Sequence, residues 1–167
     1  TYRYCTETLL TDIQPDKVEK IRSLLENLGD SIIVAGNNQK TRVHIHTNKP
    51  AEVFYQISNF ANILNPKVDD MKKQYISIHG NHSPIALVTD SIADIPENLI
   101  DKYNIHVLPI SIFFDNKEFL DKMTINPEFF HRMVENSVHF PTSSQPSVKN
   151  AENLLLFLTN HYDSVIA

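Results

Sequence analysis

The sequence lacks the features that mark a disulfide-bonded, nucleic-acid-binding or membrane-spanning protein. It contains one cysteine, Cys5, which excludes an internal disulfide and favours a reducing compartment. The formal charge is -5 and the basic residues form no cluster, so we do not expect nucleic acid as a partner. No apolar run approaches the roughly 18 to 20 residues that span a bilayer, and no basic-then-apolar leader opens the chain. We therefore expect a soluble, cytoplasmic protein without a transmembrane segment.

The chain is long enough for two small domains. Its 167 residues are 41% hydrophobic, which is sufficient to form a core. A polar, turn-rich segment at 79–84 contains glycine and proline, so we place a boundary there and expect domains at 1–80 and 84–167. His79 and His82 in this segment are expected to be solvated. Because the chain has no initiator methionine and ends in strand-like residues, we expect a fragment of a longer protein.

The first half of the chain has the element order β-α-β-β-α-β, which is typical of a ferredoxin-like α/β sandwich. Period-two alternation indicates the strands, and apolar residues at helical spacing indicate the helices. In this layout the first and third strands are neighbours in the middle of the sheet. The expected strands are 2–10, 31–35, 41–47 and 62–68, and the helices begin at Pro15-Asp16 and Pro50.

Two histidines on the third expected strand share one face with a cysteine on the first. The period of two places His44 and His46 opposite the apolar residues, and Cys5 lies on the matching face. A thiolate and two imidazoles within about 5 Å supply three of the four ligands of a tetrahedral zinc site. A polar surface without metal is the alternative. Glu7 is either a fourth ligand or, in the interpretation we favour, the partner of Arg3.

The second half of the chain has an α/β pattern with polar residues at the end of its first strand. The apolar run 85–88 continues into Thr-Asp-Ser, so Asp90 and Ser91 fall at a carboxyl end, where open α/β sheets bind ligands. In the alternative without a ligand, Asp90 binds the amides of its own turn. The apolar run 106–114 predicts a strand covered on both faces, and Pro109 indicates an edge or a bulge.

A loop rich in hydroxyl groups precedes the last expected helix, 148–162. Thr142, Ser143 and Ser144 offer neutral groups that donate and accept hydrogen bonds near a helix start, which suits a carboxylate or a phosphate. A plain helix-capping sequence is the alternative. We expect this loop and the strand end at Asp90 to converge on one edge of the sheet, where they would receive an anionic group.

Several spaced motifs agree in order along each half of the chain. In the second half they are Leu87–Ser91, Asp94, Pro96, Leu108-Pro109, Asp121 and Thr142–Ser147. In the first half they are Tyr4–Glu7, Gly29–Ser31, Val43–Thr47, Met71 and Gln74. Residues 84–167 thus resemble the amino-terminal half of the DegV family of bacterial fatty-acid-binding proteins. Residues 1 to about 75 resemble the middle region of the dihydroxyacetone-kinase-like subunit of bacterial fatty acid kinase. Together they imply a fusion of kinase and acyl carrier.

The resemblance implies a mechanism and a set of site residues. A DegV-type protein buries the acyl tail in an apolar cavity and presents the carboxylate to hydroxyl groups, and the kinase subunit transfers phosphate to it from ATP. Ser143 and Ser144 fall where the family has its carboxylate-binding Thr-Ser pair, and Thr142 is a substitute for the missing threonine. The expected lipid-binding residues are Thr142, Ser143, Ser144, Asp90 and Ser91. The positions that the resemblance associates with zinc are Cys5, His44 and His46.

The expected function is therefore fatty acid binding, with presentation of the acyl carboxylate to a kinase domain of the same or a partner chain. ATP would act only through that absent domain, so the fragment itself is expected to be inactive. Two alternatives stay open. One is a structural connector or dimerisation module with a structural zinc site, acting as a homodimer. The other is a zinc-dependent hydrolase that uses metal-bound water with Glu7 as the base.

Overall fold

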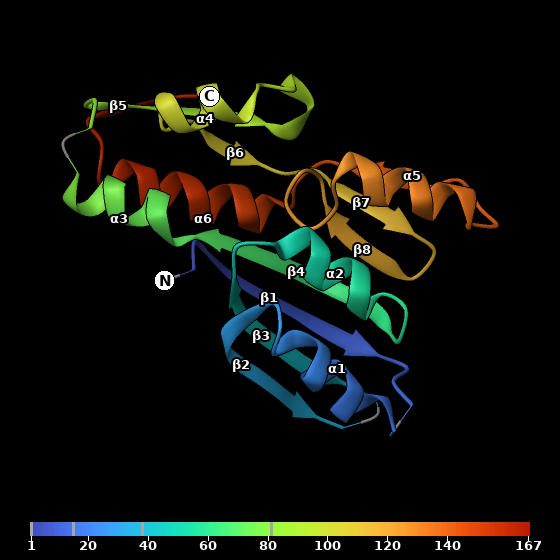
Figure 1. The fold of residues 1–167 in the computed structure, drawn as a ribbon. Coiled ribbons are helices and arrows are strands. Elements are labelled where there is room, and N and C mark those ends of the chain that lie inside the picture. Colours follow the sequence, from blue (N-terminus) through green and yellow to red (C-terminus); the bar gives the residue numbers. More distant parts are fainter. Residues whose placement is uncertain (1, 15, 38, 81) are drawn as a thin grey trace. The chain divides into compact units, whose positions relative to one another are not determined.

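The structure, a computed structural model, describes residues 2–14, 16–37, 39–80 and 82–167 (Figure 1). The predicted helix start at Pro15 lies outside the described residues. Contacts divide the chain into two compact units that alternate along the sequence. The first unit comprises Thr1–Asp70 and Ser111–Ser143, and the second comprises Met71–Ile110 and Ser144–Ala167. The predicted domain boundary at 80–84 stays a prediction.

The first unit begins with the predicted order β-α-β-β-α-β. Its strands have the spatial order β2-β3-β1-β4, and each neighbouring pair is antiparallel. The first and third strands are therefore central, as the sequence predicts for this layout. The elements are β1 (Tyr4–Thr11), α1 (Lys17–Leu25), β2 (Gly29–Gly36), β3 (Thr41–Thr47), α2 (Pro50–Ile57) and β4 (Asn62–Asp70).

The sheet of the first unit continues beyond β4 with strands from the second half of the chain. The full order is β2-β3-β1-β4-β8-β7-β9, with β8 parallel to β4 at the pair Ile63 and Lys117. The side chain of Asn126 caps the helix that follows it, because it accepts a hydrogen bond from the Phe129 N–H. The added elements are β7 (Ser111–Phe114), β8 (Lys117–Leu120), α5 (Pro127–Glu135) and β9 (Thr142–Ser144).

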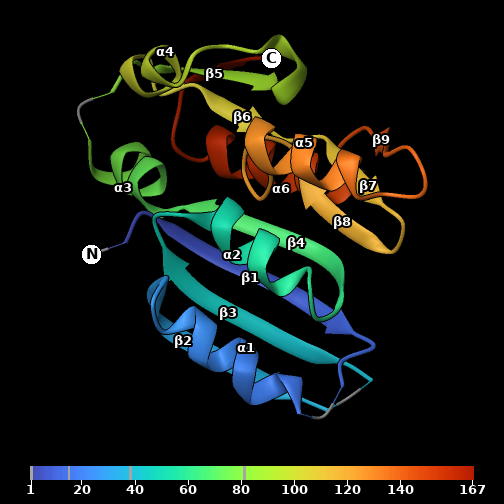
Figure 2. The ribbon, with the colours of Figure 1, turned by 45° about the vertical axis from the view of Figure 1, so that its right-hand side comes forward.

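Helices α1 and α2 cover one face of the β2-β3-β1-β4 sheet (Figure 2). Alternate residues of the central strands point to this face, and large apolar side chains there are removed from water. Burial of each such side chain stabilises the fold by about 1.5 to 3 kcal/mol. The fully buried members include Leu10, Ile45, Ile21, Leu25, Phe54 and Ile57. The opposite face is consequently left for the polar side chains of the same strands.

The second unit contains a three-stranded parallel sheet with the order β10-β5-β6. Ala86 of β5 packs with Leu158 and Tyr162 in its core. The strand-like residues expected at the end of the chain form β10, which pairs with β5. The elements are α3 (Met71–His79), β5 (Ile85–Asp90), η1 (Ser91–Ala93), α4 (Glu97–Lys102), β6 (His106–Leu108), α6 (Val148–Thr159) and β10 (Ser164–Ile166).

The predicted single strand over 106–114 is wrong. The structure divides it into β6 and β7, which belong to different sheets. Pro109 lies in the interruption, where a residue without an N–H group and with a fixed φ ends strand pairing. In the described part of the chain, no helix has both the length and the apolar character that crossing a bilayer requires.

Candidate functional site

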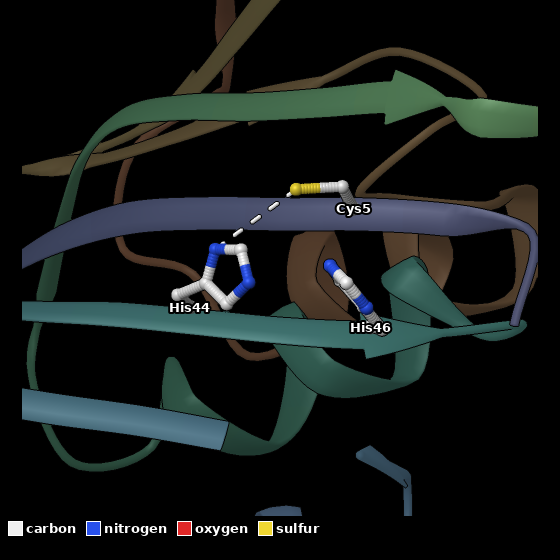
Figure 3. A group of neighbouring side chains, drawn as sticks. All are labelled: Cys5, His44 and His46. Carbon is white, nitrogen blue, oxygen red and sulfur yellow. Dashed lines mark hydrogen bonds between the residues drawn. The ribbon is translucent and has the colours of Figure 1, made fainter. Parts of the chain in front are cut away.

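Cys5, His44 and His46 gather on the face of the sheet that α1 and α2 leave uncovered. Cys5 of β1 pairs directly with His46 of β3, and His44 lies two residues before His46 on the same strand. One ligand atom from each of the three lies within 4.8 Å of the others. The Cys5 Sγ is 3.9 Å from the His44 Nδ1 (Figure 3). The grouping predicted from the period of two is therefore present.

Each histidine of this cluster has a carboxylate beside its Nδ1 atom. The His44 Nδ1 lies 3.0 Å from Glu7 Oε1, and the His46 Nδ1 lies 3.7 Å from Asp30 Oδ1. A carboxylate at one ring nitrogen orients the imidazole and leaves the other nitrogen for a metal ion. Sequence reasoning missed Asp30. A β-bulge between Asp30 and Ile33 sets the register of β2 against β3. The alternation of polar and apolar residues does not predict such a bulge.

The favoured pairing of Glu7 with Arg3 is wrong. Glu7 instead accepts a hydrogen bond of 2.5 Å from Arg42, which neighbours His44 on the same face. Arg3 pairs with Asp70 at 2.7 Å. The hydrogen bond from Arg42 lowers the pKa of the Glu7 carboxyl, and the interaction with His44 acts in the same direction.

The Cys5 thiol lies in a negatively charged neighbourhood. Burial raises the pKa of Cys5 above its ordinary value, and the nearby carboxylates of Asp69 and Glu7 raise it further. Asp69 is the direct partner of Cys5 on β4, and it is also paired with Lys67. A bound dication would favour the thiolate by replacing the thiol proton. The three side chains fit zinc, because a thiolate and two imidazoles are its preferred donors.

The hydroxyl groups of Thr142, Ser143 and Ser144 are exposed on β9. The structure assigns the cap of α6 to Ser147, whose side chain accepts a hydrogen bond from the Asn150 N–H. The capping alternative is therefore wrong for the three earlier residues. Among the described residues their hydroxyl groups have no hydrogen-bond partner, so they are available to a ligand. Their role in carboxylate binding stays a prediction.

Asp90 and Ser91 both take part in the local structure at the end of β5. The Asp90 Oδ1 accepts a hydrogen bond of 2.9 Å from the Ile92 N–H, as in the alternative without a ligand. Ser91 is buried, and its Oγ accepts a hydrogen bond of 3.2 Å from the Ile110 N–H. Asp90 belongs to the second unit and Ser143 to the first, so the predicted convergence of the two segments stays a prediction.

The fold and the two candidate sites define an α/β protein composed of segments from two families. Residues 1–78 match the FakA-like family model, which describes the middle domain of a fatty acid kinase subunit. Residues 84–167 match the model described as an uncharacterised protein of the DegV family. Since the second match covers half of the chain, the chain belongs to the DegV family. Both resemblances inferred from the motifs are thus confirmed.

Curated relatives agree with the second match. A DegV domain-containing protein of Clostridium acetobutylicum is 42% identical over 72 residues, which are 42% of this chain and 24% of the relative. A DegV domain-containing protein of Caldanaerobacter subterraneus is 39% identical over 83 residues, which are 50% of this chain and 29% of the relative. The chain therefore spans about a quarter of the length of the curated relatives it matches.

Solved structures of the same family are also similar. One is DegV from Bacillus subtilis, titled a fatty acid binding protein, with 31% identity and a TM-score of 0.45. It is matched over 48% of this chain and 29% of that protein. Another is a DegV family protein from Thermus thermophilus, titled for its fatty acid binding, with 30% identity and a TM-score of 0.44. That match covers 48% of this chain and 29% of the other.

Proposed function

We propose that this chain takes part in binding a fatty acid and in presenting its carboxylate for phosphorylation. Membership of the DegV family supports the binding step, because the Bacillus subtilis and Thermus thermophilus members are titled for fatty acid binding. The match of residues 1–78 to a fatty acid kinase subunit supports the link to phosphorylation. In this proposal the ATP-binding kinase domain is supplied by another part of the polypeptide or by a partner chain. Because the reaction uses ATP, it would take place in a compartment that contains ATP, such as the cytoplasm.

The observation that carries the binding proposal is the exposed run Thr142–Ser144. Its three hydroxyls are left without partners among the described residues, because Ser147 caps α6 in their place. Hydroxyl groups donate hydrogen bonds to a carboxylate without carrying a charge that must be neutralised. Hydrogen bonds to a charged group contribute about 1.5 to 3 kcal/mol. The acyl tail would add about 0.8 kcal/mol for each methylene removed from water.

The test is lipid binding by the full-length protein with substitutions in the hydroxyl run. The double variant S143A/S144A should bind ¹³C-carboxyl-labelled palmitate at least about tenfold more weakly, through loss of two hydrogen bonds to a charged group. The ¹³C-carboxyl resonance of palmitate bound to this variant should also shift toward the resonance of the fatty acid in water. S23A, on the exposed side of α1, is the matched control and should bind like the native protein. Equal affinity of the three proteins, or no bound lipid after extraction, contradicts the proposal.

We also propose that Cys5, His44 and His46 hold a structural zinc ion. When bound, zinc would link β1 to β3 and supply positive charge beside Glu7 and Asp30. A hydrolase needs a general base near its metal, and Glu7 is a poor one because Arg42 and His44 hold its pKa down. This observation favours the structural role over hydrolysis. Metal analysis of protein purified without a His tag should give one zinc ion per chain. If the metal-free protein is as stable as the native protein, the proposal of a structural zinc site is contradicted.

A further inference from the structure

The first compact unit contains residues from both family matches. Its β2-β3-β1-β4 sheet lies within residues 1–78, the match to the fatty acid kinase subunit, which we call the kinase segment. The elements β7, β8 and α5 lie within residues 84–167, which we call the DegV segment. Contacts nevertheless place Ser111–Ser143 in one unit with Thr1–Asp70. The two segments therefore form an interface inside this unit.

The backbone part of this interface is the pairing of β8 with β4 (Figure 2). In the kinase segment alone, β4 is the last strand of the sheet, so its outer edge would present unpaired N–H and C=O groups. The β7–β8 hairpin of the DegV segment lies along this edge, with Ile63 opposite Lys117. The Asn65 N–H of β4 also donates a hydrogen bond of 3.2 Å to Glu118 Oε2 of β8. Addition of strands to an open sheet edge is a recurring mode of protein recognition.

Aromatic side chains make the apolar part of the interface. Phe119 of β8 is fully buried, and its ring meets the ring of Phe54 of α2 edge-on, with 6.4 Å between centroids. Tyr55 of α2 stacks on Phe129 of α5, with 4.3 Å between centroids and 8° between ring planes. Each pair takes one ring from the kinase segment and one from the DegV segment. Buried aromatic anchors of this kind contribute strongly to the stability of interfaces.

The sheet that begins in the kinase segment ends at the hydroxyl run. Beyond β8 and β7 its last strand is β9, which contains Thr142 and Ser143. A sheet holds neighbouring strands at a spacing of about 4.8 Å. The strands added at β4 therefore form a rigid connection between the kinase segment and the hydroxyl groups proposed to bind the carboxylate.

We propose that the outer edge of β4, together with Tyr55 and Phe54 of α2, is the docking surface on which the kinase segment holds a DegV-family carrier. The occupant is the β7–β8 hairpin with α5 of the same chain. The surface fits a hairpin that carries a buried aromatic ring and a carboxylate within reach of the β4 backbone, as Phe119 and Glu118 do. The consequence for presentation of the acyl carboxylate rests on the proposed function, whereas docking itself does not.

The first test is hydrogen exchange of the full-length protein with Y55A, F129A and the double variant. Each single change removes one ring of the stack, so the Asn65 amide should exchange about two- to tenfold faster, the size of an aromatic pair. The double variant should exchange no faster than the single ones, because both remove the same contact. Y75A, which removes an exposed ring of α3 in the second unit, is the matched control and should leave Asn65 exchange unchanged.

Amides in the pairing of β1 with β3 distinguish docking from a shared core. They should keep native protection in Y55A and F129A, because the pairing of these two strands does not involve the hairpin. Unchanged Asn65 exchange in both single variants overturns the proposal, and so do effects that multiply in the double variant. An equal rise in exchange of the β1 and β3 amides also overturns it, because the hairpin would then be part of one indivisible core.

The second test is palmitate binding by the same full-length variants. Affinity in Y55A and F129A should stay within about twofold of native, because the hydroxyl run Thr142–Ser144 keeps its groups in both. Native palmitate binding with unchanged Asn65 exchange overturns docking and leaves the proposed function standing. Faster Asn65 exchange in these variants, with no palmitate bound by the native protein, supports docking and contradicts the proposed function alone.

Discussion

Cys5 and His46 are direct partners across the antiparallel strands β1 and β3. The same row of the sheet continues to Asp30 on β2 and to Asp69 on β4, so a thiol and an imidazole lie between two carboxylates. The next row on the same face of the sheet places Glu7 opposite His44. Sheet register thus brings together both the candidate metal ligands and the carboxylates beside them.

The Glu7 carboxylate should tune zinc affinity through His44. Glu7→Gln removes the charge that faces the His44 Nδ1, and loss of such an outer partner lowers metal affinity by about 10- to 100-fold. Competition with a zinc-binding chelator measures this change. E52Q is the matched control, because Glu52 lies on α2 and its ion-pair partner among the described residues is Lys49. A variant that retains native affinity would show that Glu7 does not support the site.

The reactivity of Cys5 should reveal the negative neighbourhood of the thiol. In metal-free protein the raised pKa keeps Cys5 protonated at neutral pH, and only the thiolate attacks an alkylating reagent. Modification by iodoacetamide should therefore be slower than that of a free thiol near pH 8 and should accelerate as the pH rises. Asp69→Asn removes one carboxylate that raises the pKa, so its rate at pH 8 should increase severalfold. The same rate in both proteins would contradict this assignment.

Gly29 should be essential to the approach of β2 to β3 at the metal cluster. A Cβ atom at Gly29 would lie 2.0 Å from the backbone oxygen of His46, and that oxygen cannot move without displacing β3. Gly29→Ala should destabilise the protein by about 1 to 3 kcal/mol, as overpacking does. It should also lower zinc occupancy, because β3 carries both histidines. Chemical denaturation and metal analysis test the two effects, and A35G on the same strand, a change that removes a side chain without adding a contact, serves as the comparison.

The sequence predicts the β-α-β-β-α-β part of the first unit, from β1 to β4, well because its signals are local. Period-two alternation places Cys5, His44 and His46 on one face, and helix periodicity places Ile21 and Phe54 on the other. The order of the four strands follows from the element order once the layout is chosen. In this part of the chain each local signal agrees with the tertiary structure.

The remaining predictions failed where strands distant in the sequence pair with each other, or where one side chain has several partners to choose from. The addition of β8 beside β4 joins residues from opposite halves of the chain, and the pair Ile63 and Lys117 carries no local signal for it. Arg3 lies on the same face of β1 as Glu7, so the sequence favoured it as the partner. In the structure, Glu7 pairs instead with Arg42 of the neighbouring strand β3. The expectation that His82 is solvated is wrong, because the fold packs its ring on Tyr162 with 4.3 Å between the ring centroids.

Replacement by alanine should destabilise the protein at Ser147 but not at Ser143. Ser147 caps α6 through a hydrogen bond to the Asn150 N–H, so Ser147→Ala should lower the free energy of unfolding by about 1 kcal/mol. Ser143 is exposed and has no partner among the described residues, so Ser143→Ala should change stability by less than about 0.5 kcal/mol. Denaturant unfolding of the lipid-free protein measures both. If Ser143→Ala is the more destabilising change, the hydroxyl run is structural and its assignment to carboxylate binding fails; if stability is retained, any loss of palmitate affinity in this variant reports the missing hydroxyl.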